Sequence, residues 1–148
     1  MKADGPPATR TGPGVHGALA GFRVVLVDDD ADARELLATV LAQRSAEVFA
    51  ASSAPEAFAL LKQHRPNVLI SDIAMPEEDG YALIRRVRAL GGQEGGQTPA
   101  VAVTAYAGRS DRSRALDAGF EAHYAKPVDI DKLIEHLLDI RSASRAPP

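Results

Sequence analysis

The sequence contains no cysteine and no tryptophan, and aromatic residues make up only 5% of its 148 positions. Without cysteine the chain has no disulfide, thiol nucleophile or sulfur metal ligand, so its chemistry must use oxygen and nitrogen atoms. No apolar stretch approaches the roughly 20 residues that span a bilayer, and the N-terminus lacks the apolar core of a signal peptide. A formal charge of -3 provides no basic field for nucleic acid. We therefore expect a cytoplasmic domain that contacts neither membrane nor nucleic acid.

The two ends of the chain differ in composition from its middle. Residues 1–21 hold five glycines and three prolines with few bulky apolar side chains, and residues 142–148 are similarly poor in them. Such segments do not bury enough apolar surface to offset the entropy lost on ordering. We expect a disordered linker or tail over 1–21, one domain over 22–141 and a disordered tail over 142–148.

Short apolar runs alternate with stretches whose apolar residues recur at helical spacing. The runs have the length of strands and lie at 22–27, 47–50, 67–71, 100–104 and 121–125. The helical stripes comprise Leu36, Leu37, Val40 and Leu41; Ala54, Ala57, Phe58 and Leu61; Leu83, Ile84 and Val87; and Ile130, Leu133, Ile134, Leu137 and Leu138. A fifth helix over 109–118 is the weakest, with only Ala115 and Leu116 as a core stripe. The alternation predicts an α/β fold, a doubly wound (βα)5 flavodoxin-like sandwich with parallel strand order 2-1-3-4-5.

Polar side chains follow four of the five predicted strands. The first strand ends in Asp28-Asp29-Asp30, the third in Asp72, the fourth in Thr104 and the fifth in Lys126-Pro127. Only one of the three consecutive aspartates can cap the next helix, and Asp30 is expected to do so. Carboxylates roughly 4 Å apart repel by about 4 kcal/mol at an effective dielectric near 20. A divalent cation, Lys126 or both must therefore compensate the charge, and oxygen ligands in an open crevice suit Mg²⁺.

This arrangement suggests roles for the strand-end residues. Asp28 and Asp29 would hold the metal directly or through water, with Asp72 projecting toward the same ion. Asp72 is then a nucleophile candidate, because a carboxylate is ionised at neutral pH and aspartyl phosphate is an established covalent intermediate. Phosphoryl transfer chiefly requires positioning and charge neutralisation. The metal, Lys126 and Thr104 would each contact one phosphoryl oxygen.

Four motifs, VLVDDD, SDIAMPEEDG, AVTAYA and YAKPVD, occur in this order and together resemble the receiver domain of bacterial two-component response regulators over about residues 22–140. The resemblance implies that Asp72 accepts a phosphoryl group from a histidine kinase or histidine phosphotransfer protein of a phosphorelay. It also implies a Mg²⁺ site, open to Mn²⁺, formed by Asp28, Asp29, Asp72 and the backbone carbonyl of Ala74. Such a domain is a signalling module, a monomer or weak dimer, that catalyses only its own phosphorylation and dephosphorylation.

The resemblance further implies that Thr104 and Lys126 bind the phosphoryl group and report its arrival, and it places the conformational switch at Thr104 and His123. An aromatic residue three places before the lysine moves with the threonine in that family, but here His123 occupies the place. We hypothesise that the switch therefore depends on pH near neutrality. Ala74 and Tyr106 occupy the two modulating positions, and since neither is a strong acid or base, we predict slow self-dephosphorylation with Tyr106 shielding the acyl phosphate.

The segment AGFEAHYAKPVD particularly resembles receivers attached to the end of hybrid histidine kinases. Three other classes of protein share parts of this pattern. A phosphatase of the haloacid dehalogenase type would carry its nucleophile in an Asp-x-Asp pattern, but Ala31-Asp32 lacks the Thr or Val expected after it. A flavodoxin-like nucleotide binder would need amides and hydroxyls, rather than three carboxylates, after its first strand. A pseudo-receiver that only binds partners would not need the complete acidic set. His136 lacks partners at metal or catalytic spacing and is assigned no role.

Overall fold

The structure is a computed structural model that describes residues 17–105 and 108–145. The predictions for residues 1–16, for Tyr106 and for residues 146–148 lie outside the described residues. The strands are β1 (Arg23–Val27), β2 (Glu47–Ala51), β3 (Val68–Ser71), β4 (Ala100–Thr104) and β5 (Ala122–Ala125). The helices are α1 (Ala31–Gln43), α2 (Ala54–His64), α3 (Gly80–Arg88), α4 (Arg109–Ala118), α5 (Ile130–Arg145) and the short 3₁₀ helix η1 (Gly92–Glu94).

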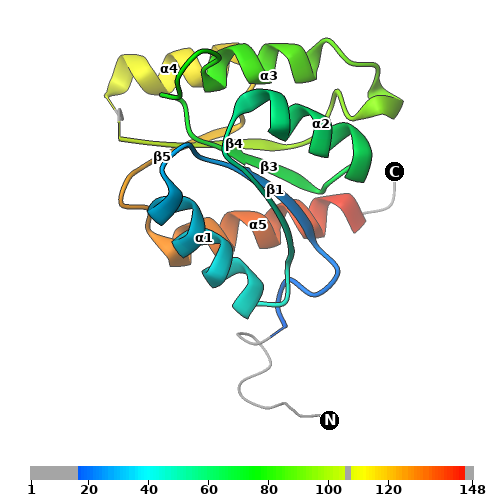
Figure 1. Ribbon diagram of the computed structural model, residues 1–148. Coiled ribbons are helices and arrows are strands. Elements are labelled where there is room, and N and C mark those ends of the chain that lie inside the picture. The colour runs from blue at the N-terminus through cyan, green and yellow to red at the C-terminus, as the bar shows by residue number, and fades with distance from the viewer. Residues whose placement is uncertain (1–16, 106–107, 146–148) are drawn as a thin grey trace.

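The strands form one parallel sheet in the order β2-β1-β3-β4-β5, as predicted. Helices α1 and α5 cover one face of the sheet, and α2, α3 and α4 cover the other (Figure 1). This is the predicted doubly wound α/β sandwich. In such a fold the carboxyl ends of β1 and β3 lie side by side at the point where the strand order reverses, which is where a ligand crevice is expected.

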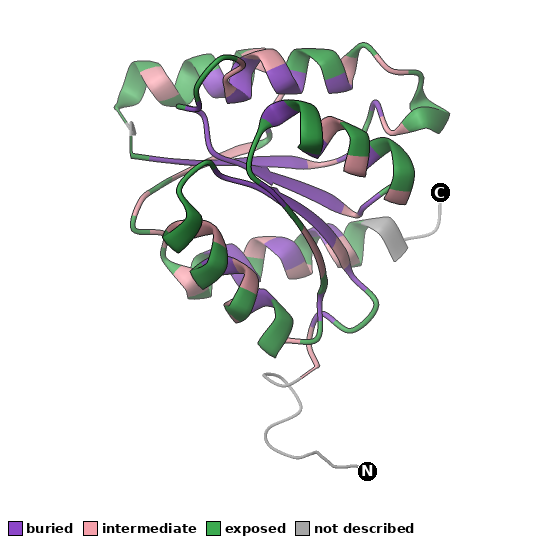
Figure 2. Cartoon of the chain, in the orientation of Figure 1, coloured by how far each residue is buried: buried purple, intermediate pink, exposed green. Residues whose placement is uncertain are grey.

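The core consists of two apolar layers, one on each side of the sheet. Successive residues of β1 point to opposite faces, so Val24 and Leu26 pack with α1 and α5, whereas Val25 and Val27 pack with α2 and α3. All four have an exposed fraction of 2% or less. Strands β3 and β4 are buried along their whole length (Figure 2), and β1 is buried after its first residue. A sheet covered on both faces explains why the strands read as continuous apolar runs rather than as alternating patterns.

Side-chain caps set where the helices next to the crevice begin. Asp30 caps α1, because its carboxylate accepts hydrogen bonds from the backbone N–H groups of Asp32 and Ala33. This confirms the cap predicted for Asp30. Asp79 caps α3 in the same way through the N–H of Ala82, at 2.9 Å. Each cap satisfies a backbone donor that would otherwise lack a partner in the first helical turn.

Two leucines assigned to core stripes are exposed, which corrects the prediction. Leu36 on α1 is 66% exposed and Leu116 on α4 is 42% exposed, whereas their neighbours Leu37 and Ala115 are buried. Adjacent helical residues differ by about 100° around the axis, so the sheet buries only one member of each pair. The stripe on α4 is therefore reduced to one fully buried side chain, Ala115, among its described residues.

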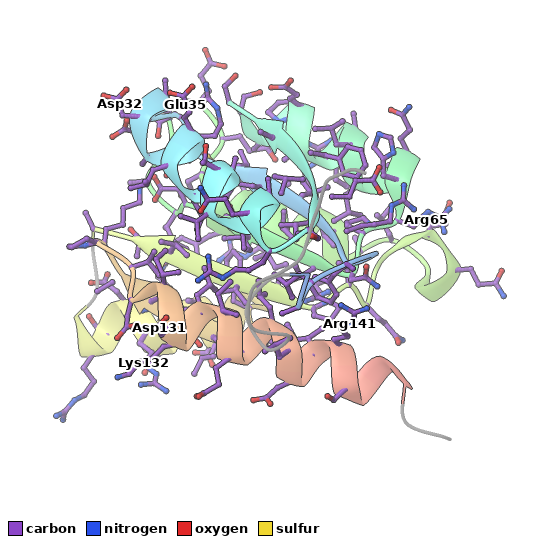
Figure 3. The ribbon with its side chains drawn as sticks, turned by 90° about the horizontal axis from the view of Figure 1, so that it is seen from below. Asp32, Glu35, Arg65, Asp131, Lys132 and Arg141 are labelled. Atoms are coloured by element: carbon purple, nitrogen blue, oxygen red, sulfur yellow. The ribbon has the colours of Figure 1, made fainter. Side chains whose placement is uncertain are left out.

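The segment 17–21, assigned by composition to the linker, packs against the domain. Leu19 is fully buried, and its N–H donates a 2.8 Å hydrogen bond to the carbonyl of Arg44. Arg141, near the end of α5, donates to the carbonyls of Ala18 and Ala20 at 2.8 and 2.6 Å (Figure 3). One buried leucine is enough to attach a segment whose overall composition predicts disorder. Among the described residues, no helix combines the length and apolar character needed to cross a membrane.

Candidate phosphoacceptor site at the carboxyl end of the sheet

Three carboxylates meet at the carboxyl end of the sheet. Val27 and Ser71 are register partners at the ends of β1 and β3, so the residues that follow them, Asp28 and Asp72, lie next to each other. The N–H of Asp72 donates to the carbonyl of Val27 at 2.9 Å. Carboxylate oxygens of Asp28, Asp29 and Asp72 all lie within 4.8 Å of one another. The structure thus brings together the acidic residues that the sequence analysis placed in one crevice.

Lys126 supplies the positive charge in this crevice. Its Nζ lies 2.7 Å from Oδ2 of Asp28 and 3.1 Å from Oδ2 of Asp72. The lysine follows β5 directly, and its N–H donates to the carbonyl of Thr104 at the end of β4 at 2.9 Å. The Lys126–Pro127 peptide bond is cis. The ammonium group therefore bridges two carboxylates whose positions are fixed by neighbouring strands.

Backbone contacts hold Asp72 and Asp28 in place. Oδ1 of Asp72 accepts a 2.7 Å hydrogen bond from the N–H of Ile73, and Oδ1 of Asp28 accepts one from Asp30 at 2.9 Å. Arg34 of α1 donates to the Asp28 carbonyl at 2.7 Å. The two carboxylates therefore present one oxygen each to Lys126 and another to backbone donors. This fixed orientation is what a nucleophile requires for an in-line reaction.

The loop after Asp72 returns close to its own start at Gly80, the first residue of α3. The N–H of Gly80 donates to the carbonyl of Ile73 at 2.8 Å. A Cβ at position 80 would lie only 2.4 Å from the carbonyl oxygen of Asp72, so no side chain fits there. This requirement for glycine ties α3 directly to the backbone of Asp72.

Burial and neighbouring charges act in opposite directions on the ionisable groups. Burial, together with the charge of Asp28, raises the pKa of Asp72, although Lys126 opposes the shift. Burial lowers the pKa of Lys126, but its bonds to Asp28 and Asp72 outweigh this effect and leave its pKa above the ordinary value. Lys126 is therefore charged at neutral pH. Because three carboxylates face one ammonium, the crevice holds an excess of two negative charges.

The donor set fits a divalent cation such as Mg²⁺. Oxygens of Asp28, Asp29 and Asp72 lie close enough to share one ion, and hard cations prefer carboxylate, carbonyl and water oxygens. Asp28 and Asp72 are buried, whereas Asp29 is exposed, so the ion position is open to water on one side. Ala74 is exposed in the loop two residues beyond Asp72, and the role of its carbonyl as a ligand stays a prediction.

The two predicted switch residues lie on the same face of the sheet. Thr104 is buried at the end of β4, and His123 of β5 is the register partner of Ala102, two residues before it. Side chains two residues apart on a strand share a face. The Nε2 atom of His123 is buried and has no hydrogen-bond partner among the described residues. Tyr106, the predicted shielding residue, lies outside the described residues.

Tyr124 does not replace His123 at the switch position. It lies one residue further along β5, so it faces α5 and packs in the other apolar layer. Its hydroxyl lies 3.1 Å from Nδ1 of His136, whose Nε2 lies 2.7 Å from Glu121. The sequence predicts no role for His136, because its partners are 12 and 15 residues away in the chain. No short-range pattern signals such a contact between a strand and the helix that follows it.

An apolar groove opens beside the carboxylates. It has a volume of about 400 Å³ and lies between α1 and the β5–α5 connection, with Leu36, Val40, Pro127 and Ile130 in its walls and Asp72 and Lys126 at its end. The exposure of Leu36, which contradicted the core prediction, results from its place in this groove. Apolar side chains left exposed next to a polar site are typical of a surface that receives a partner.

The chain matches the family profile of the response regulator receiver domain over residues 24–138. It therefore belongs to the receiver domain family and is a signalling domain of two-component systems. A protein of Leptolyngbya boryana, named "Uncharacterized 14.6 kDa protein in sodA1 3'region", is 47% identical over 116 residues, which cover 78% of this chain and 87% of that protein.

Two further relatives link the chain to receivers of histidine kinases. The hybrid signal transduction histidine kinase D of Dictyostelium discoideum is 30% identical over 82% of this chain, but the match spans only 8% of that kinase. The receiver domain of the histidine kinase CKI1 from Arabidopsis thaliana, solved in complex with Mg²⁺ and BeF₃⁻, superimposes with a TM-score of 0.76. It is 26% identical, and the match covers 88% of this chain and 96% of that domain. The predicted family is thus confirmed.

Proposed function

We propose that this domain accepts a phosphoryl group on Asp72 from a phosphohistidine donor in a Mg²⁺-dependent reaction. The observation that carries the proposal is the position of the Asp72 carboxylate. It is buried beside Asp28, lies 3.1 Å from Nζ of Lys126, and shares a cluster of oxygens within 4.8 Å with Asp28 and Asp29. A carboxylate kept ionised by an ammonium and a divalent cation, and open on one side, is suited to nucleophilic attack on phosphorus.

The reaction forms a bond between an Asp72 carboxylate oxygen and phosphorus while the phosphorus–nitrogen bond of the donor breaks. The electron pair of that bond leaves with the protonated imidazole, and Asp72 becomes a mixed anhydride. When bound, Mg²⁺ would neutralise charge on the phosphoryl oxygens, and Asp28, Asp29 and Asp72, with the Ala74 carbonyl, would hold it. Mn²⁺ would substitute for it, because it also prefers oxygen ligands in octahedral geometry.

Lys126 and Thr104 stabilise the product. The ammonium already contacts the Asp72 carboxylate at 3.1 Å, so it is placed to pair with a phosphoryl oxygen added there. The hydroxyl of Thr104 would bind another oxygen, and His123, on the same face of the sheet, would follow the movement of Thr104. This coupling transmits the conformational effect of phosphorylation to β5 and α4.

Intact mass spectrometry tests the chemistry directly. After incubation with acetyl phosphate and Mg²⁺ we expect a gain of about 80 Da, the mass of one phosphoryl group replacing a proton. Asp72→Asn should abolish the gain, and Asp29→Asn or chelation of the metal should slow it strongly. The matched control is Asp32→Asn, which removes an exposed carboxylate in the first turn of α1 outside the cluster. An unchanged mass in the wild type, or full modification of Asp72→Asn, would refute the proposal.

The donor itself is proposed to dock on the apolar groove beside the site. The groove places Leu36 and Ile130 on the approach to Asp72, where a helix carrying phosphohistidine would bury apolar surface. Leu36→Asp should slow phosphorylation by a histidine phosphotransfer domain at least about fivefold, because it removes apolar contact and adds a charge. The same variant should react with acetyl phosphate at the wild-type rate. Equal slowing with both donors would contradict a docking role.

Slow self-dephosphorylation completes the proposal. Ala74 offers no acid or base to activate water, and Tyr106 is proposed to shield the acyl phosphate. Tyr106→Glu should therefore shorten the lifetime of the phosphorylated state, measured by the decay of the added mass. We place the domain in the cytoplasm, where ATP is available to the kinase that supplies its donor.

A further inference from the structure

A second surface, whose lining residues do not include those of the carboxylate cluster, carries positive charge that the proposed phosphorylation does not use. It is a groove of about 700 Å³ on α3 and α4, lined by Arg85, Arg109, Ser110, Ser113, Arg114, Asp117 and Ala118. Three arginines and one carboxylate in this groove contrast with the formal charge of -3 of the whole chain. A local excess of positive charge on an acidic protein favours a partner of opposite charge.

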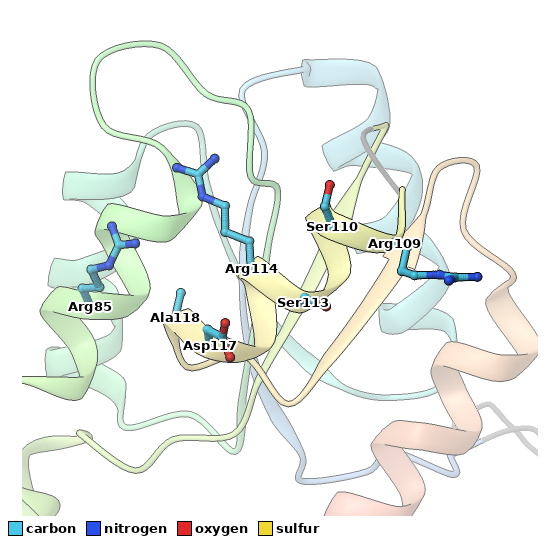
Figure 4. A pocket seen from close by; sticks show the side chains of 7 residues that line it. All are labelled: Arg85, Arg109, Ser110, Ser113, Arg114, Asp117 and Ala118. Carbon is cyan, nitrogen blue, oxygen red and sulfur yellow. The ribbon is translucent and has the colours of Figure 1, made fainter.

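Arg85 and Arg114 reach the groove from different helices. In Figure 4, Arg114 extends from α4 toward α3, on the side where Arg85 lies, whereas Arg109 extends away from both. Ser110 lies on α4 one helical turn before Arg114 and is exposed. Two guanidinium groups on neighbouring helices, with the Ser110 hydroxyl on the far side of Arg114 from Arg85, form a set of donors that one extended chain can contact together.

Arg114 is held in a fixed orientation. Its guanidinium carbon lies 4.2 Å from the centre of the Tyr81 ring, which is itself buried at 4% exposure. Stacking on an aromatic face leaves the N–H groups at the edge of the guanidinium available for a bidentate bond with a carboxylate. A side chain ordered in advance loses less entropy on binding than a flexible one. The stacking on Tyr81 thus orders the Arg114 side chain before an anionic group binds.

The other arginines of α3 have internal partners. Arg86 forms an ion pair with Glu78 at 3.0 Å, and Arg88 donates to the carbonyls of Gly96, Thr98 and Gly119. By contrast, no hydrogen bond or ion pair within the described residues uses the guanidinium groups of Arg85 or Arg114. Both side chains are exposed, so their N–H groups are accessible to a group outside the described chain.

The carboxylates nearest to Tyr81 are also engaged elsewhere. Asp79 accepts from the N–H of Ala82 at 2.9 Å, and Asp111 accepts from Gly108 at 3.1 Å, so both act as helix caps. Asp117 is the carboxylate that lines the groove itself. It lies about one helical turn from Arg114 and repels an anion bound there. Because the arginines come from two helices, carboxylates spaced along one chain can pair with them separately.

We propose that the groove between α3 and α4 binds an acidic segment of a protein partner, in which one carboxylate pairs with Arg85 and another with Arg114. Ser110 donates a hydrogen bond to the same segment. The interaction does not depend on phosphorylation of Asp72, and its failure would leave that function untouched. Because the charges are exposed, binding weakens as salt increases.

The test uses the whole chain and a synthetic peptide containing about six glutamates, titrated into ¹⁵N-labelled protein and followed by NMR. We expect amide shifts concentrated in α3 and α4. Arg85→Ala should weaken binding about threefold to fivefold, as expected for one exposed charge pair, and the double variant with Arg114→Ala about tenfold or more. Arg85 is exposed and its guanidinium forms no hydrogen bond or ion pair among the described residues, so its variant remains informative if Arg114→Ala is unstable.

Two matched control variants are expected to leave binding of the peptide nearly unchanged or to tighten it. Arg86→Ala changes the charge of the same helix by the same amount, but Arg86 is paired with Glu78, so binding should change less than about twofold. Asp117→Asn should tighten binding by about twofold, because it removes the repelling carboxylate. Equal binding by the wild type and the Arg85/Arg114 double variant would overturn the proposal. Tighter binding of pyrophosphate or a DNA oligonucleotide than of the peptide, lost in the double variant, would overturn it in favour of a phosphate ligand.

Discussion

Helices α4 and α5 both pack beside the edge strand β5, but they are attached to the sheet in different ways. α5 buries Leu133 and Leu137 completely and Ile134 and Ile140 almost completely. Among the described residues of α4, Ala115 alone is buried, and Leu116 is 42% exposed. Apolar burial is roughly proportional to the area removed from water, so α5 belongs to the stable frame of the domain and α4 does not.

Polar contacts replace part of the missing apolar contact at α4. Arg88 of α3 donates to the carbonyl of Gly119, just after α4, at 2.8 and 3.1 Å, and also to the carbonyls of Gly96 and Thr98 before β4. The helix is thus held at its carboxyl end, whereas its amino end follows the loop that starts at Thr104. A helix held at one end and weakly packed along its length can shift at low cost.

The largest effect on stability is expected from a cavity created in the core where α5 packs on the sheet. Leu137→Ala should lower the free energy of unfolding by about 3 kcal/mol, because it removes a fully buried side chain and the surrounding core relaxes only partly. Urea denaturation measures the change. The control is Glu135→Ala, an exposed site on the same helix that should stay within about 0.5 kcal/mol. A loss below about 1 kcal/mol would mean that α5 is no better anchored than α4.

Arg88→Met should cost about 2 kcal/mol, because it keeps an apolar stem but leaves the carbonyls of Gly96, Thr98 and Gly119 without their donor. Burial lowers the pKa of Arg88, so the guanidinium already carries a desolvation cost that these carbonyls offset. Hydrogen exchange should show faster opening of α4 than of α5 in this variant. Arg85→Met serves as the control on the exposed side of α3. An equal increase in the hydrogen-exchange rates of α4 and α5 would contradict a specific link between Arg88 and α4.

Asp72→Asn should stabilise the chain at neutral pH, by less than Arg88→Met destabilises it, because it removes a carboxylate whose charged form burial disfavours. Burial raises the pKa of Asp72 above its ordinary 3.8, so the ionised carboxyl destabilises the folded state. This cost is absent below about pH 3.8, appears as the pH rises through the folded pKa, and is complete at neutral pH. Thermal unfolding of both proteins across this range measures it. A stability difference that stays constant with pH would contradict the assignment to Asp72.

The smallest effect is expected from Leu116→Ala on α4, at less than about 0.5 kcal/mol, since Leu116 is 42% exposed. It is the counterpart of Leu137→Ala, and the contrast between the two leucines measures how differently the helices are attached. The same urea denaturation applies. A loss above about 1 kcal/mol would show that Leu116 contributes to the core after all.

The sequence predicts the architecture because a sheet covered on both faces leaves a strong apolar pattern. All five strands lie within about a residue of the predicted ranges, and the acidic crevice follows from the positions of Asp28, Asp29 and Asp72 at strand ends. Parallel strands necessarily bring such ends together. The site is predictable for this reason, even though its residues are far apart in the chain.

The contacts that the sequence does not predict depend on the angle of a helix or on long-range pairing. Leu36 and Leu37 are equally apolar, and only the orientation of α1 decides which of them is buried. The bonds of Arg88 to three carbonyls and of His136 to Glu121 join segments that local periodicity cannot relate. Leu19 is a single buried leucine in a segment whose composition indicates disorder.

The contact between Gly80 and the backbone of Asp72 has a consequence for how this domain tolerates change. The 2.8 Å hydrogen bond from the N–H of Gly80 to the carbonyl of Ile73 closes the loop at its base. The base of the loop therefore depends on these two backbone groups and on the absence of a side chain at position 80. The tip around Glu77, which is exposed, is not constrained by that closure. Inserted residues would therefore extend outward from the tip while the acceptor stays in register, which makes this loop a natural place to graft new recognition elements.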